Sequence, residues 1–245
     1  MADRSADFGN VHLTVVGGAD DLAARCAETI ASAIDLALAE RDRAQIALAG
    51  GETPKATYIR LGQEHLPWDR VDVLLGDERW VPADDPASNA RMVRTTLLAQ
   101  PSAGLARLHP VRTDLATPAE GVLAYASLLR QLCAGDPPCL DLVLLGLGDD
   151  GHTASLFPGT AAAAERSNLV TIGEGKGLPR ITLTAPVLSA ARQVVFLVSG
   201  VSKRQALQRL LDPEEPAERT PARLVQPRGR ISVLADQDAA ADLPL

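Results

Sequence analysis

The sequence has few aromatic residues and no long apolar run. Phe, Trp and Tyr make up 3% of its 245 residues, which leaves few rings to stack on nucleic-acid bases or to form a membrane-interface belt. No run reaches the roughly 18 apolar residues that a membrane helix needs, and the start, MADRSADFGN, lacks the apolar stretch of a secretory signal. We therefore expect a cytoplasmic protein with an aliphatic core and no membrane partner.

Cysteine and positive charge are also scarce. The three cysteines, Cys26, Cys133 and Cys139, contain no CxxC pair, so neither a disulfide framework nor a zinc ribbon is indicated. No HExxH or other clustered ligand pattern predicts a metal site. Lys and Arg number 24 against 31 Asp and Glu, a formal net charge of −7, which disfavours nucleic acid because phosphate backbones bind basic surfaces. The expected partner is a small molecule.

Short apolar runs alternate with helical patterns along the chain. Runs typical of strands lie at 11–16, 45–50, 71–76, 140–146, 181–184, 193–200 and 231–235. Helical patterns lie at about 20–40, 54–64, 88–98, 118–133 and 202–211. Strands that are apolar on both faces require helices on both sides. This predicts a single α/β domain over residues 1–245, with a mostly parallel sheet between two helical layers.

Two further features concern the surface. The polar, proline-containing stretch at 211–221 is expected to be an exposed loop, because proline cannot continue the preceding helix. The apolar face of each predicted helix is needed to cover the sheet, and no surplus stripe remains for a second chain. The sequence is therefore compatible with a monomer but does not specify the oligomeric state.

Four polar or glycine-rich segments each follow a predicted strand. They are AGGETPK (49–55), GDERWVP (76–82), GLGDDGHT (146–153) and SGVSK (199–203). In parallel α/β sheets the carboxyl ends of the strands face the crevice that binds ligands. We therefore expect all four segments to line one pocket.

The first segment has the composition of an anion-binding turn. Gly50 and Gly51 let backbone N–H groups approach an anion, Thr53 is placed as a helix N-cap, and Pro54 suits the first helical position. A helix N-terminus of this kind binds phosphate, although a tight turn with an ordinary cap remains the alternative. The spacing does not match GxxxxGK[ST], so a nucleoside triphosphate is not indicated.

The third segment contains a candidate catalytic histidine. The glycines of GLGDDG (146–151) fit the GxGxxG dinucleotide pattern. Two aspartates within it would repel a pyrophosphate, however, and Pro158 would end the helix whose dipole should attract one. His152 can exchange a proton at neutral pH, and Asp150 is placed either to orient it or to cap the turn. A structural or surface histidine is the alternative.

The remaining candidates are charged. If strand geometry continues through DER, Asp77 and Arg79 share a face and Glu78 points the opposite way. An arginine there can bind phosphate or stabilise an oxyanion, whereas a solvated ion-paired loop is the alternative. Arg180 and Lys203 are further candidate cations, each by default a surface charge.

Taken together, these segments resemble the 6-phosphogluconolactonase family. The matching stretches are AGGETP (49–54), GDERWVP (76–82), SNARMV (88–93), LGLGDDGHTASLFPG (145–159), RITLT (180–184) and SGVSKRQAL (199–207), and they end with LAD at 234–236. The resemblance implies hydrolysis of 6-phosphoglucono-δ-lactone to 6-phosphogluconate in the pentose phosphate pathway, without metal or cofactor. It also implies a three-layer, Rossmann-like fold shared with glucosamine-6-phosphate deaminase.

The resemblance assigns roles to individual residues. The family's catalytic histidine corresponds to His152 and the DER arginine to Arg79. The family's phosphate site corresponds to Gly50, Gly51 and Thr53, with Arg180 and Lys203 as further cations. The loop reads GGETP where the family often has SGGSTP, so Glu52 would repel a phosphate unless it points away.

The mechanism expected from these residues is general-base catalysis. His152 removes a proton from water as the water attacks the lactone carbonyl, and then protonates the leaving ring oxygen. Asp150 or Asp77 steadies the imidazole, while Arg79 or backbone N–H groups stabilise the oxyanion.

Two alternatives to the lactonase remain. A glucosamine-6-phosphate deaminase would have a glutamate where this sequence has Phe157, although Asp77 matches the aspartate with which a deaminase transfers protons. A non-catalytic sugar-phosphate sensor could keep the phosphate loop without the chemistry. The joint presence of His152, Asp150 and Arg79 argues against the sensor.

Overall fold

The computed structural model describes residues 3–175 and 177–244, and its main sheet has eight strands. In sheet order these are β1 (Arg4–Phe8), β2 (Val11–Val16), β11 (Ile231–Asp236), β10 (Gln193–Val198), β7 (Leu142–Gly146), β3 (Ala44–Leu48), β4 (Val71–Leu75) and β6 (Arg107–Leu108). β1 pairs antiparallel with β2, and the other neighbours pair in parallel. The predicted mostly parallel sheet is confirmed, while the polar edge strand β1 and the two-residue β6 were not predicted.

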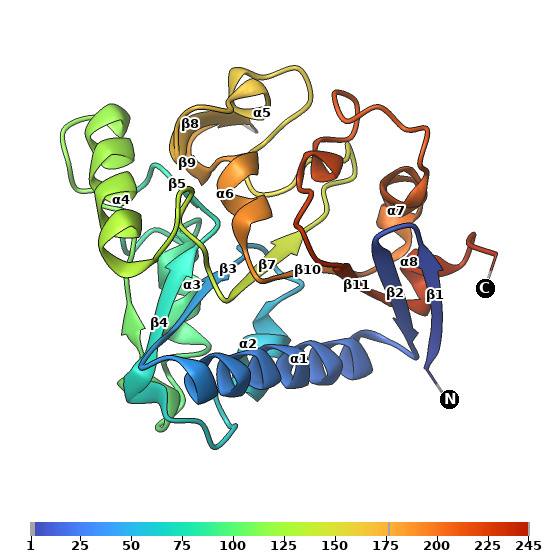
Figure 1. Ribbon diagram of the computed structural model, residues 1–245, viewed down its shortest axis with the longest axis horizontal. Coiled ribbons are helices and arrows are strands. Elements are labelled where there is room, and N and C mark those ends of the chain that lie inside the picture. Colours follow the sequence, from blue (N-terminus) through green and yellow to red (C-terminus); the bar gives the residue numbers. More distant parts are fainter. Residues whose placement is uncertain (1–2, 176, 245) are drawn as a thin grey trace.

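Helices cover both faces of this sheet. They are α1 (Ala19–Glu40), α2 (Lys55–Leu61), α3 (Asn89–Thr95), α4 (Pro118–Leu132), α5 (Ala161–Ala164), α6 (Ala185–Ala190), α7 (Arg204–Leu211) and α8 (Gln237–Ala240). In Figure 1, α1 and α2 lie on one side of the sheet and α6 on the other. None of the helices in the described residues is long and apolar enough to cross a bilayer.

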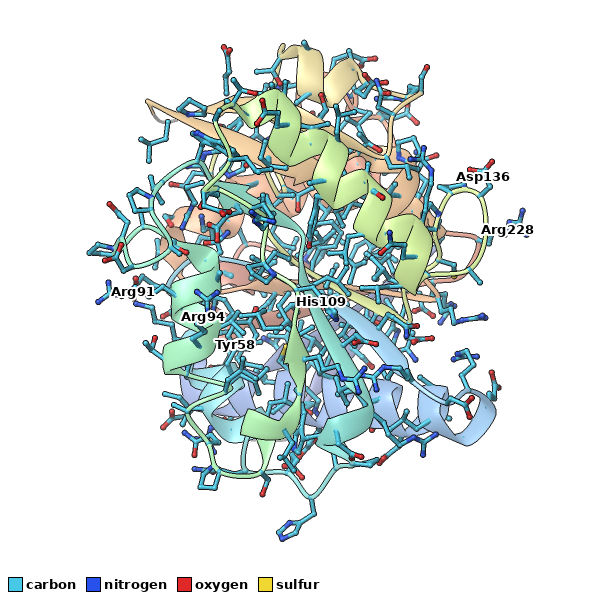
Figure 2. The ribbon with its side chains drawn as sticks, turned by 90° about the vertical axis from the view of Figure 1, so that its left-hand side faces the viewer. Tyr58, Arg91, Arg94, His109, Asp136 and Arg228 are labelled. Carbon is cyan, nitrogen blue, oxygen red and sulfur yellow. The ribbon has the colours of Figure 1, made fainter. Side chains whose placement is uncertain are left out.

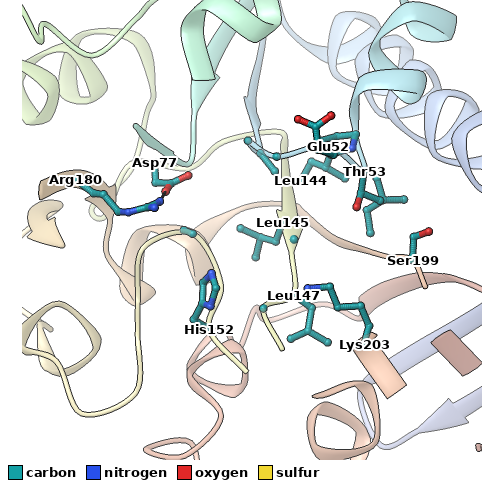
Figure 3. A pocket seen from close by; sticks show the side chains of 18 of the residues that line it. Glu52, Thr53, Asp77, Leu144, Leu145, Leu147, His152, Arg180, Ser199 and Lys203 are labelled. Carbon is teal, nitrogen blue, oxygen red and sulfur yellow. Dashed lines mark ion pairs between the residues drawn. The ribbon is translucent and has the colours of Figure 1, made fainter. Parts of the chain in front are cut away.

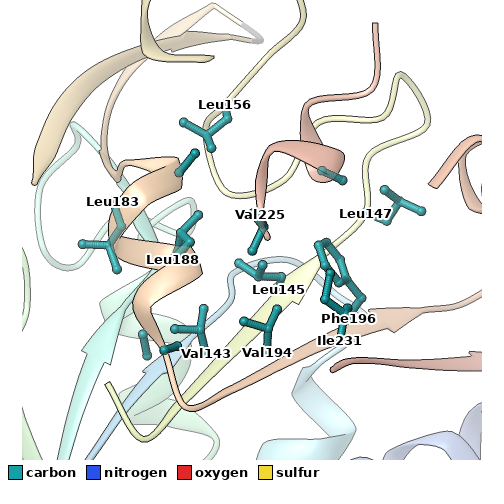
Figure 4. Packing of buried hydrophobic residues seen from close by; sticks show 14 of the residues in the cluster. Val143, Leu145, Leu147, Leu156, Leu183, Leu188, Val194, Phe196, Val225 and Ile231 are labelled. Atoms are coloured by element: carbon teal, nitrogen blue, oxygen red, sulfur yellow. The ribbon is translucent and has the colours of Figure 1, made fainter. Parts of the chain in front are cut away.

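The alternation of side chains along β7 explains this layering. Leu142 and Leu144 are fully buried in one hydrophobic cluster, which contains the apolar face of α1. Val143 and Leu145 point the opposite way, into a second cluster that includes Leu188 of α6 (Figure 4). A strand buried on both faces must be apolar throughout, which is why this sequence run shows no polar alternation.

A second, three-stranded antiparallel sheet stands beside the main sheet. It consists of β5 (Asp77–Arg79), β9 (Leu178–Leu183) and β8 (Val170–Gly175). The predicted strand at 181–184 therefore does not join the parallel sheet: it forms part of β9, which pairs with β5. The apolar pattern of a strand does not specify its partner. The register sets Asp77 opposite Thr182 and Arg79 opposite Arg180, so this small sheet carries three candidate site residues.

The predicted exposed loop at 211–221 is mostly exposed but is anchored at two points. Glu215 is buried and accepts a hydrogen bond of 2.6 Å from Thr220 Oγ1. The backbone N–H of Ala222 donates to the carbonyl oxygen of Gly151 (3.0 Å). The loop thereby supports the segment that carries His152.

The three cysteines are unpaired. Burial raises the pKa of the Cys26 thiol to about 12 and has the same effect on Cys133. Because the thiolate is the reactive form, these two buried side chains act as small apolar residues rather than nucleophiles.

Candidate active site

A pocket of about 240 Å³ opens where the four glycine-rich and polar segments meet (Figure 3). Among the residues that line it are eight predicted site residues: Gly50, Gly51, Thr53, Asp77, Arg79, His152, Arg180 and Lys203. The carboxyl ends of β3, β7 and β10 lead into its walls, and β5 adds Asp77 and Arg79. Asp150 is the one predicted residue that does not line the pocket.

The His152 segment is a loop rather than the start of a helix. Residues 147–160 contain no helix, and the next one, α5, begins only at Ala161. A dinucleotide site needs a helix N-terminus directly after the glycines, so the dinucleotide alternative lacks its main structural element. Gly148 instead makes room for the imidazole, because a Cβ on it would lie 2.0 Å from His152 Nδ1.

Asp150 binds the imidazole directly. Its Oδ1 lies 2.5 Å from His152 Nδ1 and also accepts the His152 backbone N–H at 3.1 Å. Burial alone would raise the pKa of Asp150, but hydrogen bonds from His152 outweigh it and lower that pKa. The carboxylate is therefore ionised at neutral pH and favours the tautomer with the proton on Nδ1, which leaves the lone pair on Nε2.

An aromatic ring supports the other side of the imidazole. The Phe157 ring lies 4.2 Å from the His152 ring, centroid to centroid, with an interplanar angle of 31°. The Arg180 guanidinium lies 5.6 Å from the same Phe157 centroid. Gly175 allows this packing, since a Cβ there would be 2.2 Å from the ring. Phe157 thus contacts both the histidine and the arginine.

Asp77 has several hydrogen-bonding partners. Its Oδ2 accepts from Ser155 Oγ at 2.5 Å and lies 3.5 Å from Arg180 Nη1. Its Oδ1 accepts from Asn89 Nδ2 at 3.2 Å. No chemical pattern in the sequence predicts a site role for Ser155 or Asn89, whose one signal is their place within the family-like stretches. Of the two candidate orienting acids, Asp150 is the one with a hydrogen bond to His152 Nδ1.

Arg79 and Glu78 point in opposite directions, as the alternation in DER predicts. Arg79 lines the pocket, where its Nη1 donates to Ala87 O (2.8 Å) and Asn89 Oδ1 (2.7 Å). Glu78 is 1% exposed and accepts the Asn89 and Ala90 backbone N–H groups. Burial raises the pKa of Glu78 despite these bonds. Within the described part of the chain, Arg79 forms no ion pair with a carboxylate.

The glycine loop differs from the prediction at its helix start. α2 begins at Lys55, so Pro54 rather than Thr53 occupies the N-cap position, and no side-chain capping bond is made. Lys55 N donates to Glu52 O in the turn before the helix, which delays the first helical residue. Thr53 therefore borders the pocket without capping the helix. Gly51, with φ +99°, adopts a conformation that favours glycine.

Glu52 does not oppose an anion in the pocket directly. Its carboxylate pairs with Lys55 Nζ at 2.7 Å and is 87% exposed. Glu52 is among the residues that line the pocket, and in Figure 3 its carboxylate lies at the edge of the pocket far from His152.

The two further cations approach the imidazole from different sides. Figure 3 shows Arg180 beside Asp77 and Lys203 on the opposite side of His152. Lys203 forms an ion pair with the exposed Asp149 carboxylate. Arg180 is buried, and burial lowers the pKa of its guanidinium, partly offset by Asp77. Neither is an unconstrained surface charge.

The other histidines lie outside the pocket. His12 lies 2.7 Å from Asp7, and His65 is exposed. His109 lies among other side chains (Figure 2) and binds the buried Asp72 at 2.8 Å. Across residues 3–175 and 177–244, no group of three or more His, Cys, Asp or Glu side chains is placed to hold a metal ion.

Comparison with known proteins identifies relatives over nearly the whole chain. A family model described as glucosamine-6-phosphate isomerases/6-phosphogluconolactonase matches residues 17–233. The chain is 45% identical to a 6-phosphogluconolactonase of Synechocystis sp. over 217 residues, which cover 87% of this chain and 90% of that protein. It is 35% identical to the Mycobacterium tuberculosis 6-phosphogluconolactonase over 239 residues, with 92% and 95% covered.

Solved structures share the fold. The Trypanosoma brucei 6-phosphogluconolactonase superposes with a TM-score of 0.84 at 31% identity, covering 97% of this chain and all of that one. A monomeric glucosamine-6-phosphate deaminase superposes with a TM-score of 0.79 at 22% identity, covering 94% and 98%. The second likeness shows the fold alone.

Proposed function

The chain belongs to the glucosamine-6-phosphate isomerase/6-phosphogluconolactonase family, and we propose that it hydrolyses 6-phosphoglucono-δ-lactone to 6-phosphogluconate in the pentose phosphate pathway. The observation that carries the proposal is the hydrogen-bonded His152–Asp150 pair at a pocket lined by three cationic side chains, those of Arg79, Arg180 and Lys203. Its relatives at 45% and 35% identity are named for this activity.

His152 is the general base in the proposed mechanism. Its Nε2 takes a proton from water while the water oxygen bonds to the lactone carbonyl carbon, because Asp150 keeps the other proton on Nδ1. The carbonyl electrons move to oxygen, where Arg79 or backbone N–H groups stabilise the charge. As the tetrahedral intermediate collapses, the bond from carbon to the ring oxygen breaks and His152 returns the proton to that oxygen. A positioned base of this kind contributes about 10²- to 10⁴-fold in rate.

The phosphate of the substrate is proposed to lie against the loop of Gly50, Gly51 and Thr53, with Lys203 and Arg180 as cations. The open backbone at Gly51 supports this placement, since a Cβ there would meet nothing within 4 Å. Lys203 and Arg180 both line the pocket and lie on opposite sides of His152 (Figure 3). Measuring the activity of variants of each cation toward phosphorylated and unphosphorylated lactone separates a contribution to phosphate binding from a contribution to the reaction itself.

The surroundings of Asp77 favour a lactonase over a deaminase. A deaminase needs this carboxylate to move protons between sugar carbons. Here it accepts from Ser155 and Asn89 and lies beside Arg180, so it acts as a fixed negative charge that holds the cation. The apolar Phe157 stands where the deaminase has a glutamate. Both features remove proton-transfer groups from the site.

The enzyme is further proposed to act as a cytoplasmic monomer without metal or cofactor. Every group in the mechanism comes from one chain, and unpaired cysteines suit a reducing compartment. Activity that survives a chelator, and a monomer mass by light scattering at the assay concentration, are the expected results. Loss of activity with the chelator would refute the metal-free mechanism.

Acid release in a pH-stat on freshly prepared 6-phosphoglucono-δ-lactone tests the function. Rapid hydrolysis well above the spontaneous rate is expected, with much slower turnover of unphosphorylated gluconolactone. Ammonia release from glucosamine 6-phosphate is measured in parallel. Ammonia without lactone hydrolysis would establish the deaminase instead, and ligand binding with neither activity would establish a sensor.

A further inference from the structure

Asn89, the first residue of α3, contacts three residues at the pocket, Asp77 and Arg79 of β5 and Gly50 of the glycine loop. Its Nδ2 donates to the carbonyl oxygen (2.8 Å) and the carboxylate (3.2 Å) of Asp77, and its Oδ1 accepts from Arg79 Nη1 at 2.7 Å. The amide also packs on Gly50, where an added Cβ would lie 2.0 Å from Oδ1. Asn89 is 1% exposed, so little water competes for these bonds.

The orientation of this amide is fixed by the groups around it. Turning the amide over would set Nδ2 against the Arg79 donor and Oδ1 against the Asp77 acceptors, so only one orientation satisfies both. The backbone of Asn89 is held as well, because its N–H donates to Glu78 Oε1 at 2.7 Å. Ser88 Oγ donates to Glu78 Oε2, which ties the start of α3 to β5.

The amide stands between two opposite charges. Asp77 and Arg79 lie on the same face of β5, yet each bonds to Asn89, and Arg79 forms no ion pair within the described residues. A direct ion pair between them would draw the guanidinium toward the carboxylate and leave fewer donors for a ligand. A neutral side chain with both a donor and an acceptor satisfies each charge without cancelling either.

Building on the lactonase function proposed above, we propose that Asn89 is a positioning residue, which keeps Arg79 apart from Asp77 and directed at the reacting lactone. It also fixes the distance between Arg79 and the phosphate loop through its contact with Gly50. Asn89 acts through these residues and does not touch the substrate.

A double-mutant cycle on kcat/KM tests this role. Asn89→Ala is expected to lower kcat/KM about 10- to 100-fold, the range for a lost hydrogen bond to a charged group. In the Arg79→Met background, adding Asn89→Ala should lower kcat/KM by at most about a further twofold, because Arg79 is the group through which Asn89 acts. Fully additive losses would overturn the proposal. Thr95→Ala is the matched control: it removes a side-chain hydrogen bond at the exposed end of the same helix, away from Asn89, and should retain wild-type kcat/KM.

An isosteric variant tests the contact with Asp77 even where Asn89→Ala fails to fold. Asn89→Asp keeps the acceptor for Arg79 but sets a carboxylate against Asp77, and two such groups share a proton. The protonated form donates as the amide did, so activity relative to wild type should recover as the pH falls from about 8 to about 6. The charged groups facing this pair are Arg79, Arg180 and Glu78, and His152 titration cancels in the ratio. A ratio independent of pH would overturn the proposed contact.

Wild-type turnover distinguishes the two possible failures. A wild type that does not hydrolyse the phosphorylated lactone refutes the function and this inference with it. Normal wild-type hydrolysis together with an undiminished, folded Asn89→Ala enzyme refutes the inference alone. Circular dichroism and thermal unfolding of each variant identify a loss of folding.

Discussion

Replacing Gly50 with alanine should lower activity strongly, because the added methyl group would push residues of the pocket out of position. No group that takes part in the reaction is removed. The added Cβ would lie 2.0, 2.4 and 2.5 Å from Oδ1, Cγ and Nδ2 of Asn89. The nearest distance is about 1.4 Å short of an ordinary contact. Asn89 cannot retreat freely, because Asp77 and Arg79 both bind its amide. Either the phosphate loop or the Arg79 guanidinium must therefore move by about 1 Å.

The size of this displacement sets the expected loss of kcat/KM. A misplacement of about 1 Å in an active site can cost about 10²-fold in rate, so Gly50→Ala should lower kcat/KM for the phosphorylated lactone by about that factor. The measurement is initial rate against concentration in a pH-stat. Gly76→Ala is the matched control, because Gly76 also lies just after a strand and its Cβ would meet only Leu48 O, at 3.8 Å.

Two results would refute this reasoning. Wild-type kcat/KM in Gly50→Ala would show that Asn89 adjusts freely and that the packing of the loop does not set the geometry of the site. Equal losses in Gly50→Ala and Gly76→Ala would show that any added methyl at these strand ends disturbs activity.

Three further predictions concern individual charges. Burial alone would raise the pKa of Asp72, but hydrogen bonds, first of all those from Arg43, outweigh burial and lower that pKa below 3.8. The ionised Asp72 therefore stabilises the fold above about pH 4, and this contribution to the free energy of unfolding is lost as the pH falls through the folded-state pKa. Urea unfolding should show that Asp72→Asn loses about 3 kcal/mol at pH 7 and less at pH 3, and equal losses at both would contradict this. Lys203→Ala should raise KM for the phosphorylated lactone and leave the unphosphorylated one unchanged; a kcat effect on both would remove the phosphate assignment. Asp150→Asn should lower kcat about 10- to 100-fold with KM nearly kept, and steady-state kinetics showing an unchanged kcat would exclude its orienting role.

Much of the fold follows from patterns that the sequence contains. The largely buried strands β3, β4, β7 and β10 are mostly apolar, with Gln45, Asp72 and Gln193 near their starts as the exceptions, because both faces are covered. The second sheet could not be predicted in this way. β5 has only three residues, all charged, and its pairing with β9 depends on where the chain leaves β4.

The candidate site was predictable where a residue's position follows from a strand end. His152, Asp77 and Arg79 lie at such ends and reach the same pocket. The capping role expected of Thr53 is wrong because a turn delays the helix. The position of Asn89 depends on packing between β5 and α3, which no local pattern specifies.

The general-base role of His152 is tested most directly by kcat of His152→Ala on freshly prepared 6-phosphoglucono-δ-lactone, with the exposed His65→Ala as the matched control. The mechanism predicts a fall in kcat of about 10²- to 10⁴-fold with KM nearly unchanged, and wild-type values for His65→Ala. Wild-type turnover by a folded His152→Ala enzyme would contradict it.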